Sequence, residues 1–296
     1  MDRGCLFRVI AQPARIDAAS LGVVPRWDAR LALEFAPLAG ETRLVRRSHS
    51  GPLQVQRPFH PEAGGAAHVY LLHPPGGLVG GDRLEIDVVA RNGANVLLTS
   101  PAATKFYRSR EREAAQRVAL RVESGASVEW LPQETLVFGG ATARSEVAID
   151  VVSGGRFIAW DISCLGRPAS GDDFSTGSYA QRLDVRVDGA PVAVERGVFG
   201  ADSLVRHGRF GLRGRAVFGT LIALSTEIAL ADAVRAVLPA STESDLFGVT
   251  ARRQVLVCRY LGDSVARAKE GFVRAWSTLR GALLNRAPVL PRVWAT

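Results

Sequence analysis

Residues 84–99 decide how this chain folds, and they read Leu84-Glu-Ile-Asp-Val88, Arg91-Asn-Gly-Ala94 and Val96-Leu-Leu-Thr99 in succession. The first run alternates apolar and acidic side chains, as a strand with one buried face does. The second run holds the asparagine and glycine that favour a tight turn. The third run is again rich in β-forming residues. We therefore predict two strands joined by a turn, and we interpret them as a β-hairpin.

The same arrangement recurs twice farther along the chain. Residues 118–122 and 128–131 flank the turn Glu123-Ser-Gly-Ala126, and residues 183–187 and 191–194 flank Asp188-Gly189. Asp-Gly is a dipeptide typical of two-residue hairpins. Short strands at this spacing predict a mostly β protein with a large antiparallel or stacked-sheet core.

Two segments near the C-terminus have helical spacing instead. Residues 228–238 carry an apolar stripe that stops at Pro239. A second stripe recurs every three or four residues, behind Asp263 or Ser264 as the N-cap, at Val265, Ala268, Phe272, Trp276, Leu279 and Leu283. We predict two α-helices, the second with its stripe in the core or, alternatively, docked on a partner. Residues 288–296 are too rich in proline to continue that helix.

The composition predicts a soluble cytoplasmic protein. The chain has 296 residues, of which 47% are hydrophobic and 22% charged, and no run approaches the ~18 apolar residues of a membrane span. Residues 1–10 lack the apolar core of a signal peptide. The cysteines Cys5, Cys164 and Cys258 are odd in number and widely spaced, so we expect free thiols. Because residues 1–25 show no sustained period, we predict a mobile extension before a single domain at 26–296.

The net charge of +8 is almost all arginine, since Lys105 and Lys269 are the only lysines. Such a charge suits nucleic acid, membrane phosphate or an acidic protein. The arginines are scattered and lack the interleaved aromatic residues of a base-stacking platform. We therefore expect no nucleic acid and no membrane as partner, with a basic nucleic-acid-binding protein kept as the alternative.

Four stretches are more specialised than strands require: Gly51-Pro-Leu-Gln-Val-Gln-Arg-Pro-Phe-His-Pro-Glu62, His73-Pro-Pro-Gly-Gly-Leu-Val-Gly-Gly-Asp82, Thr99-Ser-Pro-Ala-Ala-Thr-Lys-Phe-Tyr-Arg-Ser109 and Asp161-Ile-Ser-Cys-Leu-Gly-Arg167. None is a phosphate loop, a dinucleotide fingerprint, a zinc-protease motif or a nucleophile elbow. The chain is therefore not expected to be an enzyme. A metal-dependent hydrolase remains an alternative, because the members of a catalytic triad need not be sequence neighbours.

The residue types in these stretches still suggest some chemistry. Glycines of the second stretch are most simply tight turns, but His73 and Asp82 could offer transient ligands to a borderline ion such as Ni²⁺. In a strand, Lys105 and Tyr107 would share one face, and Phe106 and Arg108 the other. That arrangement would make a cationic rim for a carboxylate-bearing partner.

In this order, and together with Glu129-Trp-Leu-Pro-Gln-Glu134, Val194-Glu-Arg196 and the ending Leu290-Pro-Arg-Val-Trp-Ala-Thr296, the four stretches resemble the UreD (UreH) family of urease accessory proteins. The resemblance runs from Trp27 to Thr296. It implies a β-helical core with two helices and a cytoplasmic maturation chaperone rather than an enzyme. It also implies three partners: apo-urease, the helical protein UreF and, through UreF, the nickel-carrying GTPase UreG.

A conduit for nickel needs weak, successive ligands, because a tight site would hold the ion. We therefore expect no tightly bound cofactor and only transient Ni²⁺. The candidate ligands are His73, Asp82, Glu134, Asp161 and Glu195, and Thr99 and Thr104 are expected to line the same route. Alternatively, these carboxylates are structural partners of arginines such as Arg167 or Arg196. The candidate interface residues are Arg57, Lys105, Tyr107, Arg108 and Arg167.

Overall fold

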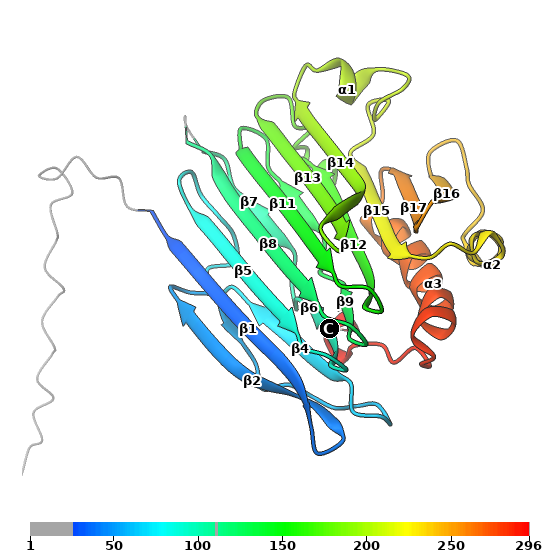
Figure 1. The fold of residues 1–296 in the computed structure, drawn as a ribbon. Helices are drawn as coiled ribbons and strands as arrows, with labels where there is room; N and C mark the ends of the chain where they lie inside the picture. The colour runs from blue at the N-terminus through cyan, green and yellow to red at the C-terminus, as the bar shows by residue number, and fades with distance from the viewer. Residues whose placement is uncertain (1–25, 110–111, 296) are drawn as a thin grey trace, which may run out of the picture.

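The alternating stretches form two β-sheets that lie face to face in a computed structural model, which describes residues 26–109 and 112–295 (Figure 1). The predicted extension at 1–25 lies outside the described residues. In spatial order, sheet 1 consists of β14 (Ala190–Gly200), β13 (Ser178–Val187), β11 (Thr142–Val151), β8 (Ala114–Val122), β5 (Arg83–Ala90), β1 (Asp28–Leu38) and β2 (Glu41–Ser50).

Sheet 2 faces it and contains more of the described strands. In spatial order these are β16 (Leu246–Arg252), β17 (Val255–Gly262), β15 (Val217–Leu224), β12 (Arg156–Leu165), β9 (Ser127–Trp130), β6 (Asn95–Thr99), β4 (Ala67–Leu72) and β3 (Gln54–Val55). Two short strands, β7 (Thr104–Phe106) and β10 (Thr135–Val137), pair with each other, and β10 also pairs with β12.

The middle of the chain winds as a solenoid between the two sheets. Successive strands alternate between sheet 1 (β5, β8, β11) and sheet 2 (β6, β9, β12). Neighbours within a sheet are parallel and in register, so Ile86 pairs with Val118 and Val118 with Val147. The predicted mostly β, β-helical core is confirmed.

Two of the three predicted hairpins are wrong. The Asp188-Gly189 hairpin is present: β13 pairs with β14, and both turn residues have the positive φ (48° and 80°) of a tight hairpin turn. By contrast, β5 and β6 belong to different sheets, as do β8 and β9. The turn after β5 and the turn after β8 each carry the chain from sheet 1 to sheet 2. The strands on either side of such a turn contact each other only through side chains. Their backbone hydrogen bonds go to the equivalent strand of the next turn of the solenoid.

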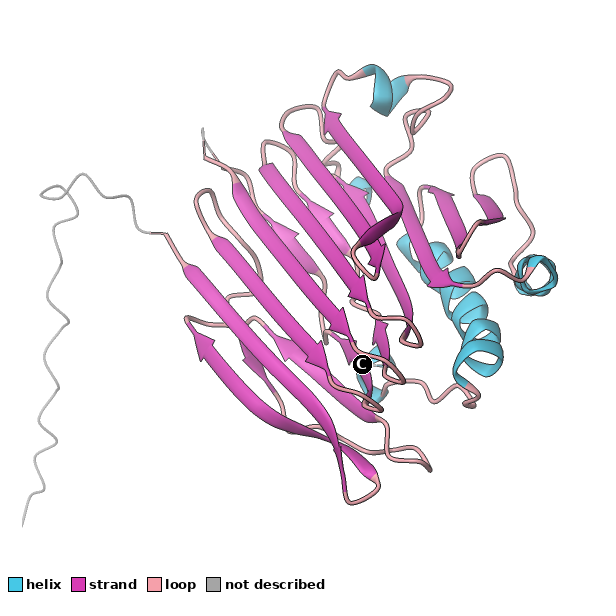
Figure 2. Ribbon diagram, viewed as in Figure 1, coloured by secondary structure: helices cyan, strands magenta, loops and turns pink. Residues whose placement is uncertain are grey.

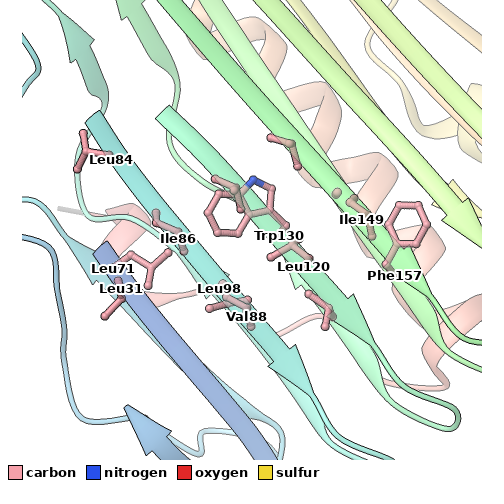
Figure 3. Close-up of a cluster of buried hydrophobic side chains, with 14 of the residues drawn as sticks. Leu31, Leu71, Leu84, Ile86, Val88, Leu98, Leu120, Trp130, Ile149 and Phe157 are labelled. Carbon is pink, nitrogen blue, oxygen red and sulfur yellow. The ribbon is translucent and has the colours of Figure 1, made fainter. Parts of the chain in front are cut away.

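Buried side chains from both sheets meet in the space between them. Figure 3 shows Ile86 and Leu120 of sheet 1 beside Trp130 and Phe157 of sheet 2. Both faces of sheet 2 are buried in its centre, since Val96 and Leu98 face this core while Leu97 belongs to a second core outside it. That two-sided burial explains why the run from Val96 to Leu98 is continuously apolar.

The second core is closed by the predicted helices (Figure 2). These are α2 (Ile228–Val237) and α3 (Val265–Leu284), and the Ser264 side chain caps α3 by accepting a hydrogen bond from the Arg267 amide. Short helical turns at α1 (Leu204–His207), Pro168–Ser170 and Arg292–Ala295 were not predicted. No helix in the described ranges is long and apolar enough to cross a bilayer. Cys164 and Cys258 are free and buried, as expected.

A buried ionic network fastens α3 to sheet 2. The guanidinium of Arg280 is fully buried and donates from Nε to both carboxylate oxygens of Glu129, at 2.9 and 3.1 Å. Its Nη2 pairs with Glu62, which also accepts from Nε2 of His68 at 2.5 Å. Burial raises the pKa of Glu62, but the bonds from His68 and Arg280 outweigh it and hold that pKa below its usual value. Trp276 adds an indole N–H bond of 2.6 Å to Glu129.

We expect Arg280→Met to lower the free energy of unfolding by about 3–5 kcal/mol, because it leaves the Glu62 and Glu129 carboxylates buried without their cation. Urea denaturation measures the change. The control is Arg274→Met on the same helix, where an exposed pair with Glu270 at 2.7 Å is worth less than about 1 kcal/mol. Equal, small losses for the two variants would show that the network does not hold the helix.

Candidate functional site

A band of polar side chains crosses the mostly apolar space between the sheets, and strand register places it there. In sheet 2, Asp161 pairs with Thr220, which pairs with Arg259. In sheet 1, Gln116 pairs with Ser145 and Ser145 with Gln181. Glu195 reaches this band from β14. We call the band the interior polar belt: Gln116, Ser145, Asp161, Ser163, Gln181, Glu195, Thr220 and Arg259.

Asp161 is the carboxylate at the centre of the belt. Its Oδ2 accepts a hydrogen bond from Gln181 at 2.8 Å, and its Oδ1 accepts one from Ser163 at 3.3 Å. No cation in the described part of the chain forms an ion pair with it within 4.0 Å. Burial raises the pKa of Asp161, and the charge of Glu195 adds to the effect, against the two hydrogen bonds.

Glu195 joins the two sheets at the outer end of the belt. Its Oε2 accepts from Thr220 at 3.0 Å and its Oε1 pairs with Arg259, both on sheet 2. Glu195 is 27% exposed and Arg259 is 56% exposed, so the pair lies where the space between the sheets opens to solvent. Of the alternatives raised from sequence, the arginine partner exists here, but it is Arg259 rather than the adjacent Arg196.

Three cavities lie along the belt and share walls. The first, of about 260 Å³, is lined by His73, Thr99, Thr104 and Trp130 among others. The second has a volume of about 20 Å³ and is lined by Trp130, Asp161, Gln181, Glu195 and Thr220 among others, which leaves room for roughly one water molecule. The third, of about 400 Å³, is lined by Gln181, Glu195, Thr220 and Arg259 among others. Trp130 separates the first cavity from the second.

The first cavity gathers three of the predicted route residues. Burial lowers the pKa of His73, against the opposing charge of Asp82, so the imidazole is neutral at neutral pH and can offer a nitrogen ligand. Thr104 lines the same wall. The hydroxyl of Thr99 is already used, because it donates to the Leu131 carbonyl at 2.6 Å and accepts from Trp294 at 2.9 Å.

Asp82 and Glu134 are not among the residues that line these cavities. Asp82 is buried, and its two oxygens accept from the backbone amides of Trp27 at 3.0 Å and Val79 at 2.9 Å. It therefore holds the glycine-rich turn against the start of β1. Glu134 lies between β9 and β10, where its charge raises the pKa of Lys269 against the larger lowering by burial.

The predicted surface residues separate into two groups. Tyr107, Arg108 and Arg167 line one cleft. The expected alternation holds only within β7, where Phe106 is buried and Lys105 is half-buried. The strand ends at Phe106, so Tyr107 and Arg108 line the same cleft instead of lying on opposite faces. Arg57 is exposed and does not line this cleft.

The donors in the belt suit a passing cation better than a resident one. Carboxylate, amide and hydroxyl oxygens are weak ligands for a borderline divalent ion. Within residues 26–109 and 112–295, no group of three histidine, cysteine, aspartate or glutamate side chains comes together as a metal site.

Several belt residues were not anticipated from sequence. Gln181, Thr220 and Arg259 sit in strands with no motif around them, and they meet Asp161 and Glu195 only through pairing across the sheets. Trp130 belongs to the quoted motif from Glu129 to Glu134, and that motif is the sequence feature that could have indicated its role. The buried Glu62 and Glu129 also lie in quoted motifs.

Comparisons with known proteins agree with the sequence motifs. The family model described as UreD urease accessory protein matches residues 28–295. The chain is similar to proteins named urease accessory protein UreD from Alkalilimnicola ehrlichii (42% identical, 93% of each chain) and Dechloromonas aromatica (42% identical, 92% of this chain and 96% of the relative). It is also similar to the protein of the same name from Chromohalobacter salexigens (44% identical, 91% of this chain and 89% of the relative).

We expect Asp161→Asn to stabilise the protein at neutral pH by about 0.5–2 kcal/mol, the usual scale of a favourable single change. The folded pKa of Asp161 is raised, so between the unfolded and folded pKa values the folded state binds more protons and stability falls as pH rises. The advantage of asparagine should therefore be small near pH ~4 and grow as pH rises toward neutrality.

Urea denaturation across this pH range measures the difference, with Asp87→Asn on the exposed face of β5 as the control that should show no such trend. A variant less stable than the natural protein at neutral pH would mean that Asp161 is a stabilising group.

Proposed function

The chain belongs to the UreD family of urease accessory proteins, and from that membership we propose that it is a cytoplasmic maturation chaperone that guides Ni²⁺ to apo-urease through the space between its two sheets. The observation that carries the proposal is the row of three wall-sharing cavities along the interior polar belt. Nickel is the cargo of this route, and the protein's own residues supply successive ligands.

Asp161 is the residue with most reason to meet a cation. It lies between the sheets with two neutral hydrogen-bond donors and no ion pair within the described residues. A buried carboxylate without a counter-ion costs free energy. A divalent ion beside it would remove that cost and oppose the rise that burial causes in the pKa of Asp161.

Glu195 and Arg259 set the strength of binding at the outer end. Arg259 already neutralises one oxygen of Glu195, and Thr220 donates to the other. An incoming cation must compete with the guanidinium, which keeps its binding weak. Weak binding is what transfer requires, because the ion must leave as readily as it arrives.

The second cavity also determines how much water accompanies the ion. It has room for roughly one water molecule, so a fully hydrated ion does not fit. The ion would exchange its water for the oxygens of Asp161, Gln181 and Glu195 as it passes Trp130.

The proposed partners are apo-urease, UreF and, through UreF, UreG. The chain has no phosphate-loop motif, so GTP hydrolysis would come from a partner. Its net charge of +8 suits acidic partner surfaces, where it speeds encounter more than it strengthens binding.

The central experiment measures urease activity and urease nickel content in cells that express urease and the other accessory proteins. The chain is intact, absent, or carries Asp161→Asn with Glu195→Gln. We expect activity to collapse without the chain and to fall roughly 10-fold or more in the double variant, the scale of losing metal-orienting groups. The variant should still assemble with its partners, because Asp161 lies between the sheets and only Glu195, 27% exposed, reaches the surface.

The matched control is Asp232→Asn with Glu270→Gln, which removes two exposed carboxylates from α2 and α3 and should leave activity unchanged. Full urease maturation in the absence of the chain would refute the chaperone role. Full urease nickel content with the belt double variant would refute the interior route but leave the chaperone role standing.

Filling the second cavity tests the route without changing a charge. Ala159 is buried and lines that cavity, so Ala159→Leu should occupy the space beside Asp161 and reduce urease nickel content roughly 10-fold, at a stability cost of about 1–3 kcal/mol. The control is Ala148→Leu, which points outward from β11 between the buried Val147 and Ile149. Thermal denaturation and co-purification confirm that both variants fold and bind. Equal nickel contents for the two variants would exclude a path through the second cavity.

A further inference from the structure

The ends of two specialised stretches, beyond the residues that line the interior route, meet on the surface. Tyr107 and Arg108 come from the end of the stretch at 99–109, and Arg167 ends the stretch at 161–167. Together with Phe138 they line a cleft of about 500 Å³. The remaining lining residues are Gly139, Ser170, Gly171, Asp172, Asp173 and Ser175. We call this the arginine cleft.

The aromatic ring of Phe138 organises the cleft. The guanidinium of Arg167 stacks over this ring at 4.2 Å from its centroid, and Tyr107 packs against it edge-on at 5.0 Å. The other side of Arg167 is fixed by its Nε, which is 3.4 Å from Oδ2 of Asp172. The Arg167 side chain is nevertheless 44% exposed, so its outer nitrogens face solvent in a fixed orientation.

Arg108 is held in place on the adjacent wall. Its Nε donates to the Gly139 carbonyl at 3.3 Å, and its two outer nitrogens have no hydrogen bond to any described residue. The backbone amide of Gly139 donates to both oxygens of Asp172, at 3.2 and 3.0 Å. A side chain at this position would collide, because its Cβ would lie 2.5 Å from Oδ1 of Asp172. Glycine is therefore required for the wall that presents Arg108.

The chemistry of the cleft selects a carboxylate. Two fixed guanidinium groups, whose outer nitrogens form no hydrogen bond with a described residue, match the fork geometry of a carboxylate. Tyrosine and arginine are also the residues that most often dominate protein–protein binding energy. The carboxylates of Asp172 and Asp173 on the same cleft disfavour a polyanion such as a nucleic-acid backbone. Bases have no platform here, because Arg167 and Tyr107 already occupy the Phe138 ring.

We infer that the arginine cleft docks an acidic segment of a partner protein in the maturation complex, with an aspartate or glutamate of that segment bound by Arg108 and Arg167. The inference rests on the proposed function, since it assigns a docking site to the partners named there. The two guanidinium groups, whose outer nitrogens form no hydrogen bond with a described residue, provide the complementarity for a single carboxylate. The interior route is not involved, because no residue of the interior polar belt lines this cleft.

The test measures binding of purified apo-urease and of purified UreF, each separately, to the full-length chain at physiological salt. We expect Arg108→Glu with Arg167→Glu to weaken binding of one of them roughly 30-fold or more, the scale of losing a hot-spot residue. The control is Arg252→Glu with Arg253→Glu, an equal charge change at the exposed end of β16 and the turn that follows it. Thermal denaturation confirms that both variants fold.

A second variant separates shape from charge. Arg108→Lys with Arg167→Lys keeps both positive charges but loses the two-pronged contact and the flat stack on Phe138, so we expect a clear partial loss. Lysine variants that bind as tightly as the natural protein would overturn the fixed carboxylate contact. Unchanged binding of both partners by the glutamate variant would overturn the docking site itself.

Two further outcomes would also contradict docking of an acidic segment in the arginine cleft. If a DNA or RNA duplex binds the natural protein but not the glutamate variant, the cleft serves nucleic acid and the inference is wrong. If deletion of the chain abolishes urease maturation while the glutamate variant binds both partners and supports full maturation, the docking inference fails and the chaperone role stands.

Discussion

The register between successive coils is the constraint on which the rest of this structure depends. Because β5, β8 and β11 are parallel and in register, residues such as Ile86, Val118 and Val147 form one continuous inward row. The same rule places Gln116, Ser145 and Gln181 in a row, so a few polar residues far apart in sequence become a band. A one-residue slip in any coil would turn its inward residues outward and break both rows.

Sheet 2 serves as a wall between two interiors, and α3 fixes its outer side. Trp276 and Arg280 bind Glu129 from that side, while the next residue along the strand, Trp130, separates the first two cavities on the other. The C-terminal tail adds a further brace, since Trp294 donates to Thr99 and packs 5.3 Å from Trp160. Packing on the helix side therefore restrains the wall of the proposed interior route.

The sequence predicted six of the strands, the two longer helices and, as candidate ligands, both carboxylates of the belt, Asp161 and Glu195, because each left a local pattern. It did not distinguish a hairpin from a crossing between sheets at 84–99, since period-two alternation and turn residues are the same in both. What decides is whether each strand finds its partner in the next coil, and local sequence does not contain that information. Arg259 was missed for a similar reason: it reaches Glu195 from 64 positions away, through the pairing of β15 with β17.

Two buried carboxylates of the protein have different partners, and the contrast supports the proposed route. Glu129 is buried at 2% exposure and receives a fully buried arginine and an indole N–H, as a structural carboxylate must. Asp161 receives only an amide and a hydroxyl. Arg280 neutralises Glu129, which shows that this fold can accommodate a buried arginine beside a buried carboxylate. No such arginine accompanies Asp161 in the part of the chain that the structure describes. Asp161 has no partner cation among the described residues, which weakens the native state, and this cost is understandable if the proposed route binds and releases a mobile cation there.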